Sequence, residues 1–266
     1  MLELSDGSSV WHRTTGTGPT IVNIHGSGFG HRNFAMLTPH LTDDFTVVDF
    51  DLPGYGQSTA AGPVGLAEWA DYTAEVIGLV ADGPVHIHGT SMGALVALHL
   101  ASRHPELVDR LILTCCMFRY DNAARFMRQT WKHEAATNGM QAAADLTAVS
   151  GFSRSFFDRP DALEIITLLH MGMAASDPAA FIAGTESLEA SDLSPLLGTI
   201  RSRTMLIAGD EDDMTPSRPA PSGSGYADAL AQIREVEEHT IEQSGHYLVL
   251  ERPEAVATLI TTFLAS

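Results

Sequence analysis

The chain has 266 residues, 44 % of them hydrophobic and 18 % charged, so it can bury a large core without a metal or disulfide staple. Lys and Arg number 15 against 33 Asp and Glu, and the formal net charge of −18 disfavours nucleic acid and anionic membrane surfaces as partners. No apolar run reaches the roughly 20 residues of a membrane span, and the N-terminus lacks a secretion-signal pattern, so we expect a cytoplasmic protein.

Short β-rich runs alternate with longer helical stretches in the first half of the chain. In chain order we expect a strand at 21–24, a helix around 33–41, a strand at 45–51, a helix at 66–81, a strand at 85–88, a helix at 91–103 and a strand at 110–114. This alternation predicts an α/β fold with a mostly parallel central sheet flanked by helices. The run 10–13 is a candidate antiparallel edge strand.

The alternation stops between residues 117 and 199. Helix-forming stretches follow one another there, at 123–134, 139–149 and 161–173. We therefore predict a helical cap at 117–199, inserted into a core made of 1–116 and 200–266. The core resumes with strands at 204–208 and 234–240 and ends in a helix at 253–264, which has proline in its first turn, whereas the Pro-, Ser- and Gly-rich run 216–225 predicts a flexible loop.

Residues 89–93, Gly-Thr-Ser-Met-Gly, fit the pattern G-x-S-x-G directly between an expected strand and an expected helix. A sharp strand-to-helix turn would expose Ser91 at the sheet edge, where the helix N-terminus favours developing negative charge. A serine hydroxyl needs a base to become a nucleophile, and the base needs an orienting acid. The alternative interpretation is that Ser91 only caps the helix.

Candidates for the base and the acid follow two later strands. His246 stands in Ser-Gly-His-Tyr before the last helix, and histidine suits a base near neutral pH. Asp210, Asp212 and Asp213 all follow the strand at 204–208 and compete for the role of the acid. The chain order Ser91, acid, His246 is one of the known orders of such a triad.

With these segments the chain resembles the α/β-hydrolase superfamily, in particular its cap-bearing ester and lactone hydrolases. The segments that carry the resemblance, besides the one around Ser91, are His-Gly-Ser-Gly at 25–28, Asp-Leu-Pro-Gly-Tyr-Gly-Gln-Ser at 51–58, Gly-x-x-Asp-x-x-x-Pro at 209–216, and Gly-His-Tyr at 245–247 with Glu-Arg-Pro at 251–253. The run after Pro216 is longer than is usual in this family.

The resemblance implies roles for individual residues. It selects Asp212 as the acid. It implies that the backbone N–H groups of Ser27 and Met92 form the oxyanion hole, with Gly28 as a weaker candidate for the first donor. The implied activity is hydrolysis of a carboxylic ester or lactone through an acyl-enzyme, with no cofactor and no metal.

The insertion contains eight of the 19 aromatic residues and five of the ten Met, and its net charge is −4. A neutral, fairly hydrophobic small-molecule substrate fits this composition. We predict substrate contacts from Gly28, Phe29, Phe118, Trp131 and Tyr247. The aromatic and Met side chains of the insertion can either line a pocket or join the cap helices, and the sequence does not separate these possibilities; they include Phe118, Phe126, Trp131, Phe152, Phe156, Phe157 and Met171.

Several other interpretations are weaker. Residues 26–30, Gly-Ser-Gly-Phe-Gly, lack the final glycine spacing of a dinucleotide fingerprint. His86 and His88 share a strand face, but no further ligand follows them, so we expect them to be buried or hydrogen-bonded rather than bound to metal. Adjacent Cys115 and Cys116 are expected to be free thiols at a strand end. The same triad also serves C–C bond hydrolases and acyltransferases, and a ligand receptor on this fold is a further alternative; the oligomeric state is not predicted.

Overall fold

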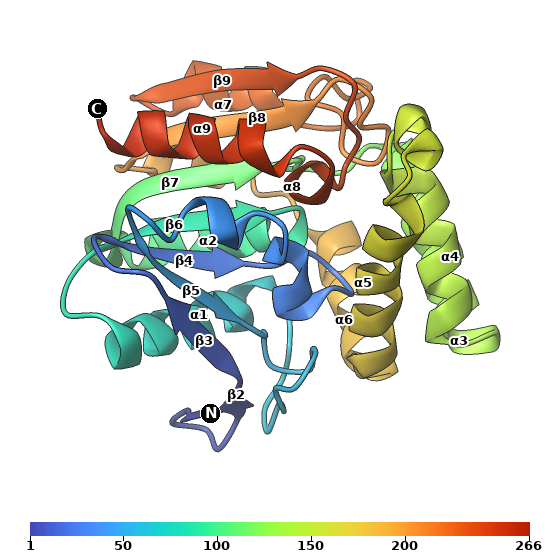
Figure 1. Ribbon diagram of the computed structural model, residues 1–266, viewed down its shortest axis with the longest axis horizontal. Coiled ribbons are helices and arrows are strands. Elements are labelled where there is room, and N and C mark those ends of the chain that lie inside the picture. Colours follow the sequence, from blue (N-terminus) through green and yellow to red (C-terminus); the bar gives the residue numbers. More distant parts are fainter.

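The computed structural model describes residues 1–266 and is built around a seven-stranded sheet (Figure 1). The strand order is β3-β5-β4-β6-β7-β8-β9, and only β3 runs antiparallel to its neighbour. The strands are β3 His12–Thr15, β4 Thr20–Ile24, β5 Thr46–Phe50, β6 Val85–Thr90, β7 Val108–Thr114, β8 Arg203–Gly209 and β9 Val236–Ile241. The predicted α/β fold is therefore confirmed, and so is the antiparallel edge, which begins at His12 and pairs with β5.

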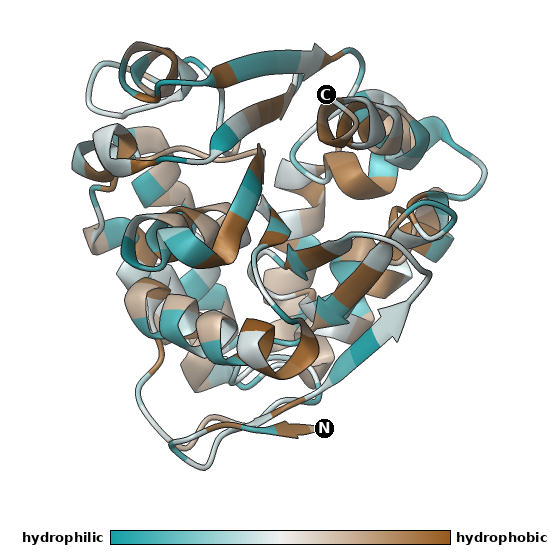
Figure 2. Ribbon diagram, turned by 90° about the vertical axis from the view of Figure 1, so that its left-hand side faces the viewer, coloured by the Kyte–Doolittle hydropathy of each residue, from teal (hydrophilic) through white to brown (hydrophobic).

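Helices cover both faces of this sheet (Figure 1). Helices α1 (Leu66–Val80) and α2 (Met92–Arg103) pack together on one face, and α9 (Pro253–Leu264) covers the other. The remaining elements of this part are α7 Tyr226–Gln232, α8 Leu248–Glu251, the short η3 Pro105–Leu107 and a two-stranded sheet of β1 Leu2–Glu3 and β2 Ser9–Val10. All six residues of β6 are buried, as expected for a strand with helices on both sides. Figure 2 shows hydrophobic segments on the central strands and on the helices beside them.

The segment between β7 and β8 is helical and stands beyond the carboxyl ends of the strands (Figure 1). It contains α3 Asn122–Thr137, α4 Met140–Gly151, η4 Arg154–Asp158, α5 Ala162–Ala175, α6 Pro178–Ala190 and η5 Ser194–Thr199. Its buried apolar side chains belong to the same hydrophobic cluster as those of the sheet, so the two parts share one core. No single helix is long and apolar enough to span a membrane; α5 and α6 pass that test only as a pair, bent by 102°.

The predicted helix around 33–41 is wrong. The structure has two short 3₁₀ helices there, η1 Gly30–Phe34 and η2 Thr38–His40. Pro39 lies in the first turn of η2, and its ring and missing N–H do not allow one α-helix to run through this position. Cys115 and Cys116 are buried free thiols just after β7, as predicted.

Candidate active site

Ser91 occupies a strained turn between β6 and α2. Its φ of 56° and ψ of −120° are unusual for a residue other than glycine. A Cβ at Gly89 would collide with the backbone of Gly93, and a Cβ at Gly93 would collide with the carbonyl oxygen of Ile24. The two glycines of the motif therefore let the turn close against β4, and the turn presents the Ser91 hydroxyl at the sheet edge.

A chain of hydrogen bonds links three predicted residues from three separate loops. The Ser91 hydroxyl lies 2.8 Å from Nε2 of His246, and Nδ1 of His246 lies 3.1 Å from Oδ2 of Asp212. The side chains of His246 and Asp212 are buried. In this arrangement His246 can accept the serine proton on Nε2 while its Nδ1–H donates to the carboxylate.

The Asp212 carboxylate is held by its own loop as well as by His246. Oδ1 accepts hydrogen bonds from the N–H groups of Met214 and Thr215, each at 2.9 Å, and Oδ2 accepts one from the Thr215 hydroxyl at 2.8 Å. Burial by itself would raise the pKa of Asp212, but the charge of His246 and these hydrogen bonds outweigh it and the pKa is lowered. The carboxylate is therefore ionised at neutral pH.

Asp210 and Asp213 make no such contacts with His246. The structure brings only Asp212 of the three candidates to the histidine. Thr215 was missed by the sequence reasoning, although its hydroxyl also lies 3.0 Å from Nδ1 of His246. A threonine three residues after an aspartate is a common partner in a local side-chain turn, and this spacing was the available signal.

Ser27 and Met92 lie together beside Ser91. The Ser27 hydroxyl is 3.3 Å from Sδ of Met92. The Ser27 N–H donates to no acceptor in the protein, and Met92 begins α2, where N–H groups have no partner inside the helix. These two N–H groups are thus free to donate to a bound oxygen.

The loop that carries Ser27 is fixed by buried polar side chains. His25 accepts a hydrogen bond from the Leu52 N–H at 2.9 Å, and its Nδ1 lies 2.8 Å from the carbonyl oxygen of Gly26. Burial lowers the pKa of His25, so the ring is neutral and Nδ1–H donates to that carbonyl. Asn33 accepts a hydrogen bond from the Gly26 N–H at 2.9 Å.

A small cavity lies between Ser91 and the inserted helices α3, α4 and α6. Its volume is about 20 Å³. The cavity is lined by Ser27, Ser91, His246 and, of the predicted substrate contacts, Phe29, Trp131 and Tyr247. Four lining residues from the inserted helices were missed, because only tertiary packing selects them from the many residues of these helices: Arg128, Thr147, Phe181 and Leu188.

The structure places the other two predicted substrate contacts elsewhere. Gly28, with φ of 87°, packs under Met173 of α5, which leaves no room for a Cβ. Phe118 is fully buried and packs against Tyr226, with ring centroids 6.3 Å apart. Neither residue lines the cavity, and both substrate contacts stay predictions.

The five remaining aromatic and Met side chains named in the sequence analysis do not line the cavity either. Phe152 and Phe156 stack on each other at 4.0 Å between ring centroids and join the helices. Phe126, Phe157 and Met171 are exposed at the surface.

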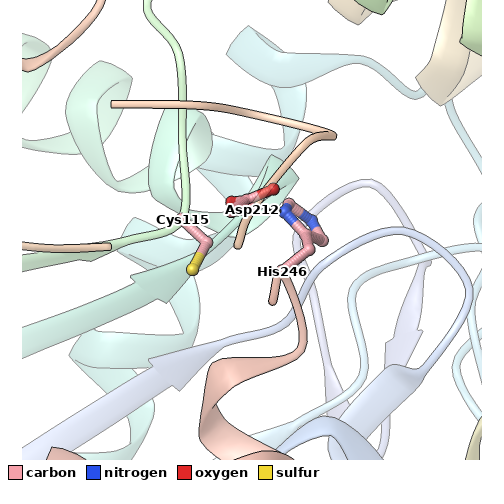
Figure 3. A group of neighbouring side chains, drawn as sticks. All are labelled: Cys115, Asp212 and His246. Carbon is pink, nitrogen blue, oxygen red and sulfur yellow. Dashed lines mark hydrogen bonds and ion pairs between the residues drawn. The ribbon is translucent and has the colours of Figure 1, made fainter. Parts of the chain in front are cut away.

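Cys115, Asp212 and His246 form a compact group of three residue types that can bind a metal ion (Figure 3). Both ring nitrogens of His246 are already engaged, Nδ1 by Asp212 and Nε2 by Ser91. Burial raises the pKa of the Cys115 thiol well above its usual range, whereas a metal binds the thiolate. This donor set does not fit a metal.

His86 and His88 are both buried, as the sequence predicts. Nδ1 of His88 lies 3.2 Å from Oδ1 of Asn23, and its Nε2 lies 3.0 Å from Oγ1 of Thr114. Nδ1 of His86 lies 3.3 Å from Oδ2 of Asp109.

The fold and the residues around Ser91 together define a class of enzyme. The model of the alpha/beta hydrolase family matches residues 21–259. The chain belongs to the alpha/beta hydrolase family. The enol-lactonase of Burkholderia xenovorans LB400 has the same fold, with a TM-score of 0.86, 22 % identity and coverage of 98 % of each chain.

Several relatives of similar length are named as methyl ester esterases. The pimeloyl-[acyl-carrier protein] methyl ester esterase of Methylococcus capsulatus is 30 % identical, with 95 % of this chain and 97 % of that protein covered. The protein of the same name from Neisseria meningitidis serogroup B is 32 % identical, with 91 % of each chain covered. The comparisons confirm the prediction of an enzyme of this family that acts on ester bonds.

Proposed function

We propose that this protein is a serine hydrolase in which Ser91, His246 and Asp212 form the catalytic triad. The observation that carries the proposal is the continuous chain of hydrogen bonds from the Ser91 hydroxyl through His246 to the buried Asp212 carboxylate. His246 takes the proton of Ser91 on Nε2 while Ser91 Oγ attacks the carbonyl carbon of an ester. The protonated His246 then donates this proton to the leaving alkoxide, and an acyl-enzyme remains.

Water completes the reaction in a second half that mirrors the first. His246 removes a proton from the water, the resulting hydroxide attacks the acyl carbon, and the acid leaves as Ser91 recovers its proton. The N–H groups of Ser27 and Met92 stabilise the oxyanion of both tetrahedral intermediates, because they have no other partner and lie beside the serine. Asp212 keeps His246 in the tautomer that leaves Nε2 free to accept.

The substrate class follows from the relatives and from the cavity. Two relatives are named as methyl ester esterases, and the apolar rings of Phe29, Trp131 and Tyr247 line the cavity, which supports a carboxylic ester or lactone with an apolar part. Residues 117–199 form the cap. Since the cavity has about 20 Å³, roughly the space of one water molecule, the cap has to move before an ester can enter.

Hydrolysis of p-nitrophenyl butyrate tests the proposal. We expect turnover by the wild type and a loss of at least about 10⁴-fold in Ser91→Ala, because the nucleophile is removed. Ser102→Ala, on the same helix but bound to Thr199, is the matched control and should keep wild-type rates. Wild-type rates in a correctly folded Ser91→Ala variant would exclude this mechanism.

A further inference from the structure

Arg128 is a buried cation in the wall of the candidate active site. It lies on α3, is 1 % exposed and lines the same cavity as Ser91 and His246. No carboxylate lies within ion-pair distance of its guanidinium. Glu189, which lies on the facing helix α6, is instead paired with Lys132 at 2.8 Å.

The protein leaves most of the hydrogen-bonding capacity of Arg128 unused. One guanidinium N–H donates to the carbonyl oxygen of Ala124 at 3.2 Å, and Nε is buried without a partner. The guanidinium lies over the ring of Tyr120, 3.8 Å from its centroid, and 5.0 Å from that of Trp131. These rings orient the cation, and apart from the Ala124 carbonyl no acceptor meets hydrogen-bond geometry with its donors.

Trp131 adds a second donor that has no partner. It lies one turn after Arg128 on the same face of α3 and lines the same cavity, and its Nε1–H is buried without an acceptor. Buried polar groups normally have hydrogen-bond partners. Burying an unpaired charge costs free energy, and an arginine cannot lower this cost by losing its proton. Two donors without partners in one wall of the cavity therefore indicate a binding site for a ligand that carries a hydrogen-bond acceptor.

We propose that Arg128, assisted by Trp131, binds an anionic oxygen group, most simply a carboxylate, at the far end of the substrate. The inference rests on the proposed function, because it assigns the opposite end of the same substrate to Ser91. The reacting ester and the linking chain remain neutral and apolar, in keeping with Phe29 and Tyr247 in the wall. Arg128 is thus a determinant of specificity and not a group that acts on the reacting atoms.

The test compares two series of methyl esters of increasing chain length. One series consists of monomethyl esters of linear dicarboxylic acids, and the other of methyl alkanoates in which a methyl group replaces the free carboxylate. At one chain length we expect the wild type to prefer the carboxylate ester by about tenfold or more in kcat/KM, the effect of a hydrogen bond to a charged group. Arg128→Met should abolish the preference, mainly through KM, and Arg128→Lys should retain part of it.

Controls separate a local contact from general charge effects. Arg125→Met removes a positive charge from the same helix, at a residue that does not line the cavity, and should leave the preference unchanged. Trp131→Phe removes the indole N–H from the wall, together with part of the ring, and should weaken the preference. Thermal melting checks that each variant is folded.

The two proposals fail in different ways. If the wild type hydrolyses both series equally at every chain length, or if folded Arg128→Met keeps the preference, the carboxylate site is wrong while the esterase stands. If the wild type hydrolyses no ester of either series, the proposed function itself fails. Should Arg128→Met not fold, the wild-type preference and its change in Arg128→Lys decide the question.

Discussion

The hydroxyl of Thr215 lies between two members of the proposed triad. It donates to Oδ2 of Asp212 at 2.8 Å and lies 3.0 Å from Nδ1 of His246. The Nδ1–H of His246 is therefore shared between the carboxylate and this hydroxyl oxygen, which confines the ring to the plane that aims Nε2 at Ser91. We infer that Thr215 is a positioning residue, because it contacts His246 and Asp212 and does not line the cavity.

Replacing Thr215 tests this role. Thr215→Val keeps the shape of the side chain and removes the hydroxyl, so we expect kcat for an ester to fall about three- to tenfold, the effect of one hydrogen bond, with KM nearly unchanged. Thr215→Ser restores the hydroxyl and should recover most of the rate. Steady-state kinetics of the two variants provides the comparison; equal rates in Thr215→Val and the wild type would remove Thr215 from the account.

At the scale of the element, the turn between β6 and α2 depends on close backbone approach. Because a Cβ at Gly93 would collide with the Ile24 carbonyl, we expect Gly93→Ala to destabilise the fold by about 3 kcal/mol, the upper range for overpacking. Gly78, in α1, has nothing within 4 Å of an added Cβ, and Gly78→Ala should stabilise by up to about 1 kcal/mol. Urea unfolding measures both. A similar stability for Gly93→Ala and the wild type would refute this packing argument.

The same elements show how far the sequence reasoning reaches. The strands, α2 and the order of the loops bearing Ser91, Asp212 and His246 were predictable, because buried parallel strands and the glycine-flanked turn leave strong local patterns. The helix around 33–41 was wrong because Pro39 acts against an otherwise helical composition.

The wall of the cavity was the least predictable part of the site. Phe118 and Trp131 look alike in sequence, yet only Trp131 lines the cavity. Arg128 reads as an ordinary surface arginine of an amphipathic helix, and its burial depends on how α3 packs against the rest of the molecule. Long-range packing of this kind leaves no signal at a single position.

At the scale of the whole molecule, stability depends on histidines that remain neutral in the core. Burial lowers the pKa of His88 to about 3, whereas histidine in an unfolded chain titrates near 6.5. Between these two values the unfolded chain binds more protons, so His88 leaves stability unaffected above about pH 6.5 and reduces it as the pH falls. His88 changes the free energy of unfolding by at most about 1.4 kcal/mol per pH unit.

His88→Gln tests this linkage in the intact fold. Glutamine can still donate and accept a hydrogen bond between Asn23 and Thr114, but it does not titrate. We expect the free energy of unfolding to fall less steeply with decreasing pH in the variant than in the wild type between pH 6.5 and pH 4. The difference between the two slopes corresponds to the uptake of up to one proton on unfolding, whatever the absolute stability of the variant. Urea unfolding across this pH range gives the two slopes; parallel slopes would show that His88 does not titrate on unfolding.

The central claim is that His246 activates Ser91 as a nucleophile, and intact mass spectrometry after incubation with a small alkyl fluorophosphonate tests it most directly. We predict one stoichiometric adduct on the wild type, no adduct on Ser91→Ala, and much slower labelling of His246→Ala, because the serine proton then has no acceptor. An unlabelled, folded wild type, or equal labelling of the wild type and Ser91→Ala, would contradict the claim.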